Sequence, residues 1–326
     1  MKSPAGRRRR ARRRRDKRSR EARVAHPKPK TDSAPRKVNS ETLGEETRAN
    51  PANLTGDEPG AGEYPPPENW LSLSAAIPGR SHLARGRPGQ DAAAGGTEPR
   101  PWLVAADGIG SSDRSEFGSL GATDVIREQL DVLAPLVDEA LDANSMRGKE
   151  LWATAANWIY RALTARQKSL SRSFGGTPAD YRFTLAFAAL GRRRLGYALV
   201  GDAALVVKRN GELSLPQIPY GGEFANETRF VGSSGPLSSI LSHGCLPAEG
   251  VEGAVGFSDG VSTRALSPDG TRPASALSQI LEDASGGTLL REDLFEFLSD
   301  PVWDRSTGDD RCIALLAAQK ERKCTR

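Results

Sequence analysis

Apolar positions recur with a helical period over two stretches in the middle of the chain. Between residues 149 and 170, one face of a 3.6-residue period collects apolar side chains, namely Leu151, Ala155, Trp158, Ile159, Ala162 and Leu163. This spacing predicts an amphipathic helix that packs the face on a core. Residues 119–141 show a similar pattern, and Pro135 predicts a break in that helix.

After residue 180 the pattern changes to apolar, β-branched and aromatic runs, which are typical of strands. Such runs cover residues 181–190, 194–209, 226–232, 251–260 and 311–318. The Asn210-Gly211 pair predicts a two-residue hairpin turn. Two more helices are expected near 274–283 and 290–298. Because strand follows strand from 181 to 258, the pattern favours an α+β fold with antiparallel sheets over alternating βαβ units.

The folded part of the chain is expected to begin near Trp70, where WLSLSAAIPG starts with a strand-like alternation. Residues 1–65 contain the block RRRRARRRRDKRSR (7–20) and then a polar stretch with little aliphatic content. Such a segment buries too little apolar area to offset its chain entropy. We therefore expect three regions: a disordered basic and polar tail (1–65), a folded domain (66–320) and a short basic tail (321–326).

Charge is distributed unevenly between the tail and the rest of the chain. Residues 1–40 hold 17 Lys and Arg against 3 Asp and Glu, so of the net charge of +5 the remaining residues account for −9. The basic block at 7–20 is therefore a candidate arm for nucleic acid or another anionic surface.

Cysteine, histidine and hydropathy exclude several classes of protein. Three cysteines without a Cys-x-x-Cys spacing fit a reducing compartment and argue against a disulfide framework. With only three histidines, a zinc site of His and Cys is hard to assemble. No apolar run approaches the roughly 20 residues of a transmembrane helix, and no hydrophobic segment follows the charged N-terminus as in a signal peptide. The expected location is cytoplasmic.

The stretch PWLVAADGIGSSDRSEFGSLGA (101–122) runs from an apolar strand into Asp107 and a glycine-rich turn. A nucleotide-binding loop is one interpretation, but Asp113 stands where a Rossmann fingerprint needs its last glycine, and no Gly-Lys-Ser/Thr is present. A carboxylate before the glycines would also repel a pyrophosphate. The other interpretation is a metal site with Asp107 as a ligand.

Other acids stand at or next to the ends of apolar runs. They are Asp91, Asp202, Asp259, Asp309 and Asp310. A single Asp-Gly pair is ordinary turn chemistry. Several acids gathered at one mouth of a sheet sandwich would repel one another, and hard divalent cations with oxygen ligands relieve that repulsion.

At this point the sequence resembles the metal-dependent Ser/Thr protein phosphatases (the PPM or type 2C family). The resemblance runs in order from about residue 74 to 318 through GQDA, AADGIGS, TLA, VGDAAL, FSDGV and GDDRCIALL. SHLARGRPGQDA and FANETRFV (224–231) are most similar to a bacterial subgroup. The resemblance implies a four-layer αββα sandwich of two antiparallel sheets flanked by helices. It also implies hydrolysis of phosphoserine and phosphothreonine in proteins at a binuclear Mn²⁺ or Mg²⁺ centre.

The resemblance also assigns roles by position. Asp107 would bridge two metal ions, the Gly108 carbonyl would bind one of them, and Asp259 and Asp310 would bind the other. Asp91 would hold metal-bound water, and Asp202 with Asp259 would form a third, weaker metal site. A metal-bridging water would attack the phosphorus, so that no protein nucleophile is needed. The sequence has no Cys-x5-Arg loop, which fits that mechanism.

Some positions depart from the family pattern. Many members carry a phosphate-binding Arg five residues before the acid at Asp91, where this chain has Gly86. Arg85, Arg87 and His82 are the candidate replacements. The usual Asp-Asn of the last motif is Asp310-Arg311 here, with Asp309 as the alternative ligand if the register shifts by one. Arg311 would brace Asp309 or point to solvent. Glu227 and Arg229 are expected on one face of a strand.

Two alternative functions remain open at this stage. One is a catalytically weak phosphatase-like scaffold, because the phosphate-binding Arg is missing from its usual place. The other makes the Arg-rich tail the functional element, bound to nucleic acid. For a phosphatase, the expected partners are phosphorylated proteins, including a Ser/Thr kinase or its targets.

Overall fold

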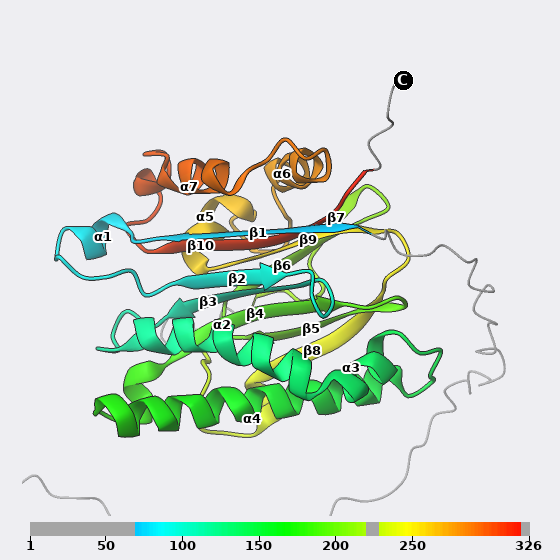
Figure 1. Cartoon of the computed structure of the whole chain (residues 1–326). Coiled ribbons are helices and arrows are strands. Elements are labelled where there is room, and N and C mark those ends of the chain that lie inside the picture. Colours follow the sequence, from blue (N-terminus) through cyan, green and yellow to red (C-terminus); the bar gives the residue numbers. More distant parts are fainter. Residues whose placement is uncertain (1–68, 220–227, 321–326) are drawn as a thin grey trace, which may run out of the picture. The chain divides into compact units, whose positions relative to one another are not determined.

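Two antiparallel five-stranded sheets pack face to face in the computed structural model, which describes residues 69–219 and 228–320 (Figure 1). One sheet has the order β1-β10-β9-β6-β7. Its strands are β1 (Trp70–Ile77), β10 (Arg311–Ala318), β9 (Val251–Phe257), β6 (Ala204–Arg209) and β7 (Glu212–Ser214). The other has the order β2-β3-β4-β5-β8. Its strands are β2 (Ala92–Gly96), β3 (Trp102–Gly108), β4 (Phe183–Leu190), β5 (Arg194–Val200) and β8 (Leu241–Pro247).

Helices cover the outer face of each sheet (Figure 1). The sheet that contains β3 carries α2 (Ser115–Val132), α3 (Ala134–Leu141) and α4 (Gly148–Phe174). The other sheet carries α5 (Asp259–Ala265), α6 (Ala276–Ser285) and α7 (Arg291–Ser299), and a single turn, α1 (Arg80–Leu83), lies between β1 and β2. Buried side chains form one cluster under each helical layer and a third between the sheets. The predicted α+β sandwich of four layers is confirmed.

Several local predictions are confirmed by the described residues. The helix expected over 119–141 is divided at Leu133, with Pro135 in the first turn of α3. Asn210 and Gly211 have φ values of 51° and 80°, as the tight turn between β6 and β7 requires. The two late helices and the last strand also lie where the pattern predicts them. No helix in the described part of the chain is both long and apolar enough to cross a bilayer.

Two predictions about the strands are corrected by the structure. Residues 228–232 form an irregular segment and not a strand, while the other residues of the predicted strand and of FANETRFV lie outside the described part. Arg229 therefore does not lie on a strand face as predicted, and Glu227 lies outside the described residues. The edge strand β8 was missed, because its residues LSHGCLP are only partly buried and show no clear alternation.

One core residue was also assigned wrongly. Trp158 was expected on the buried face of α4, but it is 51% exposed, and the Arg161 guanidinium lies 5.2 Å from its ring centre. Trp152 is fully buried instead, stacks on Phe187 and donates a hydrogen bond from Nε1 to the Tyr197 carbonyl at 2.9 Å. The buried stripe of α4 runs through positions 152, 155, 156, 159 and 163, and residue 158 lies just outside it.

The predicted tails at 1–65 and 321–326 lie outside the described residues, so the domain limits drawn from the sequence stay predictions.

Candidate metal centre

Acidic side chains meet where strand ends of the two sheets coincide. Asp107 and Gly108 end β3, Asp91 directly precedes β2, and Asp202 follows β5. In the other sheet, Asp259 begins α5 just after β9, and Asp310 directly precedes β10. Adjacent strands of both sheets are antiparallel, so the end of one strand and the start of the next share an edge.

Three of these carboxyl groups lie within hydrogen-bonding reach in a chain from Asp91 through Asp107 to Asp259. The pKa of Asp91 is raised to about 8, chiefly by burial and also by the charges of Asp310 and Asp259, against a hydrogen bond from Ser258. Burial also raises the pKa of Asp107 well above its ordinary value, and Asp91 and Asp259 add to that shift. The pKa of Asp259 is raised to about 6, chiefly by burial. Without cations, these carboxyl groups therefore resist ionisation together.

Asp202 completes what we call the acid cluster, namely Asp91, Asp107, Asp202 and Asp259. The Thr228 hydroxyl donates a hydrogen bond to Asp202 Oδ2 at 3.2 Å. Burial raises the pKa of Asp202, and the charge of Asp309 contributes to the shift. Asp202 in turn raises the pKa of Asp107 and Asp259, which places it within electrostatic range of both.

Asp310 is buried and has three hydrogen-bond partners around its carboxylate. The Gly79 amide donates to Oδ1 at 2.6 Å, the Gln90 amide donates to Oδ2 at 2.5 Å, and His82 Nδ1 lies 2.8 Å from Oδ1. Both carboxylate oxygens are therefore engaged in holding the segment that leads into Asp91. These hydrogen bonds join the segment between β1 and β2 to the residue that precedes the last strand, β10.

Asp309, which directly precedes Asp310, is exposed and acts on other acids. Its charge raises the pKa of both Asp202 and Asp259, whereas Asp310 acts on Asp91. Ligand atoms of His82, Asp309 and Asp310 lie within 4.8 Å of one another. The sequence indicated both Asp309 and Asp310 as candidate ligands. It could not show that the two acids interact with different neighbours.

The glycine after Asp107 has a steric role. The Gly108 amide donates a hydrogen bond to the Gln90 carbonyl at 3.1 Å. A Cβ at this position would lie 2.5 Å from that carbonyl oxygen. Only glycine therefore allows β3 to approach the residue before Asp91 this closely.

The remaining residues singled out in the sequence do not join the acid cluster as expected. Arg85 and Arg87 are exposed. His82 is buried at 5% exposure and is held by Asp310. Arg311 is also buried and pairs with Asp304 at 3.2 Å, so it neither braces Asp309 nor points to solvent.

The residues present fit divalent cations. Asp91 Oδ2 is buried and has no hydrogen-bond partner among the described residues. An unpartnered carboxylate oxygen is costly in a protein interior unless a cation or a bound water satisfies it. The donor set is oxygen only, as Mg²⁺ and Mn²⁺ prefer.

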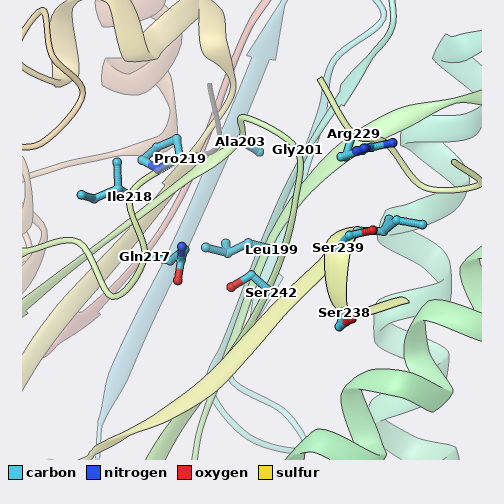
Figure 2. A pocket seen from close by; sticks show the side chains of 11 residues that line it. Leu199, Gly201, Ala203, Gln217, Ile218, Pro219, Arg229, Ser238, Ser239 and Ser242 are labelled. Carbon is cyan, nitrogen blue, oxygen red and sulfur yellow. The ribbon is translucent and has the colours of Figure 1, made fainter. Parts of the chain in front are cut away.

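A cavity of about 290 Å³ opens beside Asp202, between the end of β5 and the start of β8 (Figure 2). Gly201 and Ala203, the two chain neighbours of Asp202, both line it. The other lining residues are Leu199, Gln217, Ile218, Pro219, Arg229, Ser238, Ser239, Ile240 and Ser242. The cavity is therefore lined by both apolar side chains and hydroxyl and amide groups, and two of its lining residues are chain neighbours of Asp202.

Comparisons with known proteins agree with this arrangement. Residues 78–299 match a model of the protein phosphatase 2C family. The serine/threonine-protein phosphatase 3 of Escherichia coli (strain K12) is 26% identical over 261 residues, which cover 76% of this chain and 98% of that relative.

Two similar solved structures share the fold. One is the catalytic domain of the serine/threonine protein phosphatase PstP in complex with two manganese ions, with a TM-score of 0.51, 14% identity, and coverage of 77% of this chain and 99% of that one. The other is PppA, a key regulatory component of T6SS in Pseudomonas aeruginosa, with a TM-score of 0.50, 17% identity, and coverage of 76% and 97%.

Proposed function

Because this chain belongs to the protein phosphatase 2C family, we propose that it hydrolyses phosphoserine and phosphothreonine in proteins at a pair of Mn²⁺ or Mg²⁺ ions held by the acid cluster. The observation that carries this proposal is that Asp91, Asp107 and Asp259 lie together, half-buried, and that the buried Oδ2 of Asp91 has no hydrogen-bond partner among the described residues. Phosphorylated proteins are the substrate class, including Ser/Thr kinases or their targets. The cavity beside Asp202 offers room for a side chain of such a protein.

The metal-binding residues follow from their positions around the cluster. Asp107 interacts with both Asp91 and Asp259, and it would hold cations together with the Gly108 carbonyl. Asp259 would be a further ligand, and with Asp202 it would hold a third, weaker ion. When bound, the cations supply a hydroxide near neutral pH and screen the charge of the phosphate. Asp91, with a free Oδ2, orients the attacking water and accepts its proton.

Asp309 is the better candidate than Asp310 for the remaining ligand. The sequence favoured Asp310 and kept Asp309 as the alternative. Both oxygens of Asp310 are engaged by Gly79, Gln90 and His82, whereas the charge of Asp309 reaches Asp202 and Asp259. We therefore assign metal binding to Asp309 and the positioning of Gln90 and Asp91 to Asp310.

Turnover of a phosphothreonine peptide by the full chain tests the proposed function. Manganese should support hydrolysis and a chelator should abolish it. Asp107→Asn and Asp259→Asn should each lower kcat by about 100-fold or more, because each removes a metal ligand. Asp131→Asn, on the exposed face of α2, is the matched control and should retain activity.

Calorimetry with Mn²⁺ distinguishes the alternatives. A wild-type protein that binds Mn²⁺ but shows no turnover would favour the phosphatase-like scaffold. A protein in which Asp259→Asn keeps both Mn²⁺ affinity and turnover would refute the metal assignment.

A further inference from the structure

Arg182 is anchored next to the turn that follows Asp107. It directly precedes β4, whose first residues pair with the end of β3 as Phe183 with Gly108 and Thr184 with Asp107. The Ile109 amide donates a hydrogen bond to the Arg182 carbonyl at 3.2 Å. The backbone of Arg182 is therefore fixed opposite Ile109, two residues beyond Asp107 in the register.

Strand alternation directs Arg182 to the same side as Asp107. Phe183 and Leu185 belong to the core cluster under the helices, whereas Ala186 and Ala188 belong to the cluster between the sheets. Arg182 has an extended backbone, with φ −78° and ψ 146°, so the alternation continues through it. Arg182 and Thr184 therefore both lie on the side of the sheet that faces the other sheet. Asp107 lies on the same side, because it is paired with Thr184.

An aromatic ring supports the guanidinium of Arg182. Its Cζ lies 4.5 Å from the centre of the Phe230 ring. The segment that carries Phe230 is itself held on both sides, because the Val231 amide donates to the Phe183 carbonyl at 2.9 Å and the Thr228 hydroxyl donates to Asp202. The segment that stacks on Arg182 is therefore tied both to the start of β4 and to Asp202.

The donor groups of Arg182 are not used by the described residues. Its Nε is buried without a hydrogen-bond partner, and the guanidinium forms no ion pair within the described part of the chain. Asp180, the acid nearest in sequence, accepts from the Thr177 amide at 2.7 Å, which lowers its pKa, and the charge of Arg182 adds to that shift without forming an ion pair. Nearby Arg114, in contrast, is committed to the Phe174 carbonyl at 2.6 Å.

We propose that Arg182, stacked on Phe230, binds the phosphate group of the substrate beside the acid cluster. This proposal rests on the proposed function and adds the residue that the Gly86 position lacks. The acid cluster repels a phosphate dianion unless positive charge stands on its rim. A guanidinium offers two parallel N–H donors to phosphate oxygens, and stacking on an aromatic ring fixes its plane in advance. Arg85 and Arg87 are exposed and lack such support.

Phosphopeptide kinetics and phosphate binding test Arg182 directly. Arg182→Ala should lower kcat/KM by about tenfold to 100-fold, mainly through a higher KM, and should raise the inhibition constant of inorganic phosphate by a similar factor. Arg182→Lys should recover only part of the loss, because lysine keeps the positive charge but lacks the two parallel N–H donors of the guanidinium. Phe230→Leu should give a smaller loss of the same kind. The affinity for Mn²⁺, measured by calorimetry, should stay within about twofold of wild type in all three.

Arg192→Ala is the matched control, because Arg192 is exposed in the turn at the opposite end of β4. It should leave KM and phosphate inhibition unchanged. Calorimetric titration of the Mn²⁺-loaded protein with inorganic phosphate tests Arg182 even without turnover. Inactive wild-type protein would count against the proposed function alone. Unchanged phosphate affinity in Arg182→Ala, or a larger effect of Arg87→Ala, would overturn the assignment of Arg182.

Discussion

At the scale of single residues, the adjacent acids Asp309 and Asp310 show how neighbours in sequence take on different tasks. Asp310 accepts hydrogen bonds from the backbone amides of Gly79 and Gln90, whereas the charge of Asp309 acts on the acid cluster. The sequence alone ranks both acids as ligands, because each stands before an apolar strand. Only their hydrogen-bond partners separate them.

Isosteric substitution of the two acids gives opposite expected results. Asp309→Asn should weaken Mn²⁺ binding by about tenfold or more, with little effect on the melting temperature of the metal-free protein. Asp310→Asn should lower the melting temperature, because a buried amide donor loses its acceptor at a cost of about 1–3 kcal/mol. Calorimetry with Mn²⁺ and thermal unfolding in chelator measure the two effects. The reverse pattern would restore Asp310 as the ligand.

The proposed phosphate contact at Arg182 was not among the candidates that the sequence offered. Those candidates, Arg85, Arg87 and His82, flank the expected position of the family's arginine. Arg182 lies far from them in sequence and comes near the end of β3 only through the pairing of β3 with β4. In the sequence, Arg182 stands out only as a charged residue just before an apolar strand. Such a residue is common for purely structural reasons, so the sequence did not indicate a phosphate contact there.

At the scale of elements, most helices and strands follow from periodicity, because they bury one face. Helix α4 is the clearest case, yet Trp158 was placed on its buried face and Trp152, which is fully buried, was not. A period of 3.6 residues fixes the direction of a face only within about one position. Strand β8 and the segment after Thr228 were misjudged for a different reason: short edge segments with mixed burial carry little periodic signal.

The two tryptophans of α4 offer a matched comparison of burial. Trp152→Ala should lower the free energy of unfolding by about 3–5 kcal/mol, because it leaves a cavity against Phe187 and removes the bond to the Tyr197 carbonyl. Trp158→Ala should change it by less than about 1 kcal/mol, the value of an exposed contact with Arg161. Urea unfolding monitored by circular dichroism measures both. Equal losses would contradict the burial of Trp152 alone.

At the scale of the whole molecule, uninterrupted strands from residue 181 to 258 favoured antiparallel sheets, and the family resemblance implied the αββα order of layers. The gathering of acids from distant parts of the sequence at one edge follows from that layout and from the family resemblance together. Which carboxyl groups share burial, and how strongly, depends on the packing of both sheets. That packing sets the pH dependence of folding.

Carboxyl groups with raised pKa values make the metal-free protein less stable as the pH rises. In the folded state Asp91 and Asp259 keep their protons up to about pH 8 and about pH 6, whereas the unfolded chain loses them near the ordinary value of 3.8. Protonation thus favours folding, fully below about pH 4 and progressively less through those two values. The free energy of unfolding in chelator should fall by several kcal/mol between pH 5 and pH 8.

Urea titrations at several pH values in chelator measure this slope. Asp91→Asn should flatten its upper part, since Asn carries no proton to lose, and Mn²⁺ should restore stability at pH 8. A metal-free protein that gains stability as the pH rises from 5 to 8 would contradict the assigned burial of the carboxyl groups.

The pairing of β1 with β10 joins Trp70 to Ala318, and the Asp310 carboxylate holds the amides of Gly79 and Gln90. The loop that presents Asp91 therefore acquires its support only when the final strand arrives. During synthesis, a nascent chain still attached to the ribosome holds most of the acids but cannot yet assemble them. Dephosphorylation would begin only after the last strand has been synthesised, so unfinished chains would have no phosphatase activity.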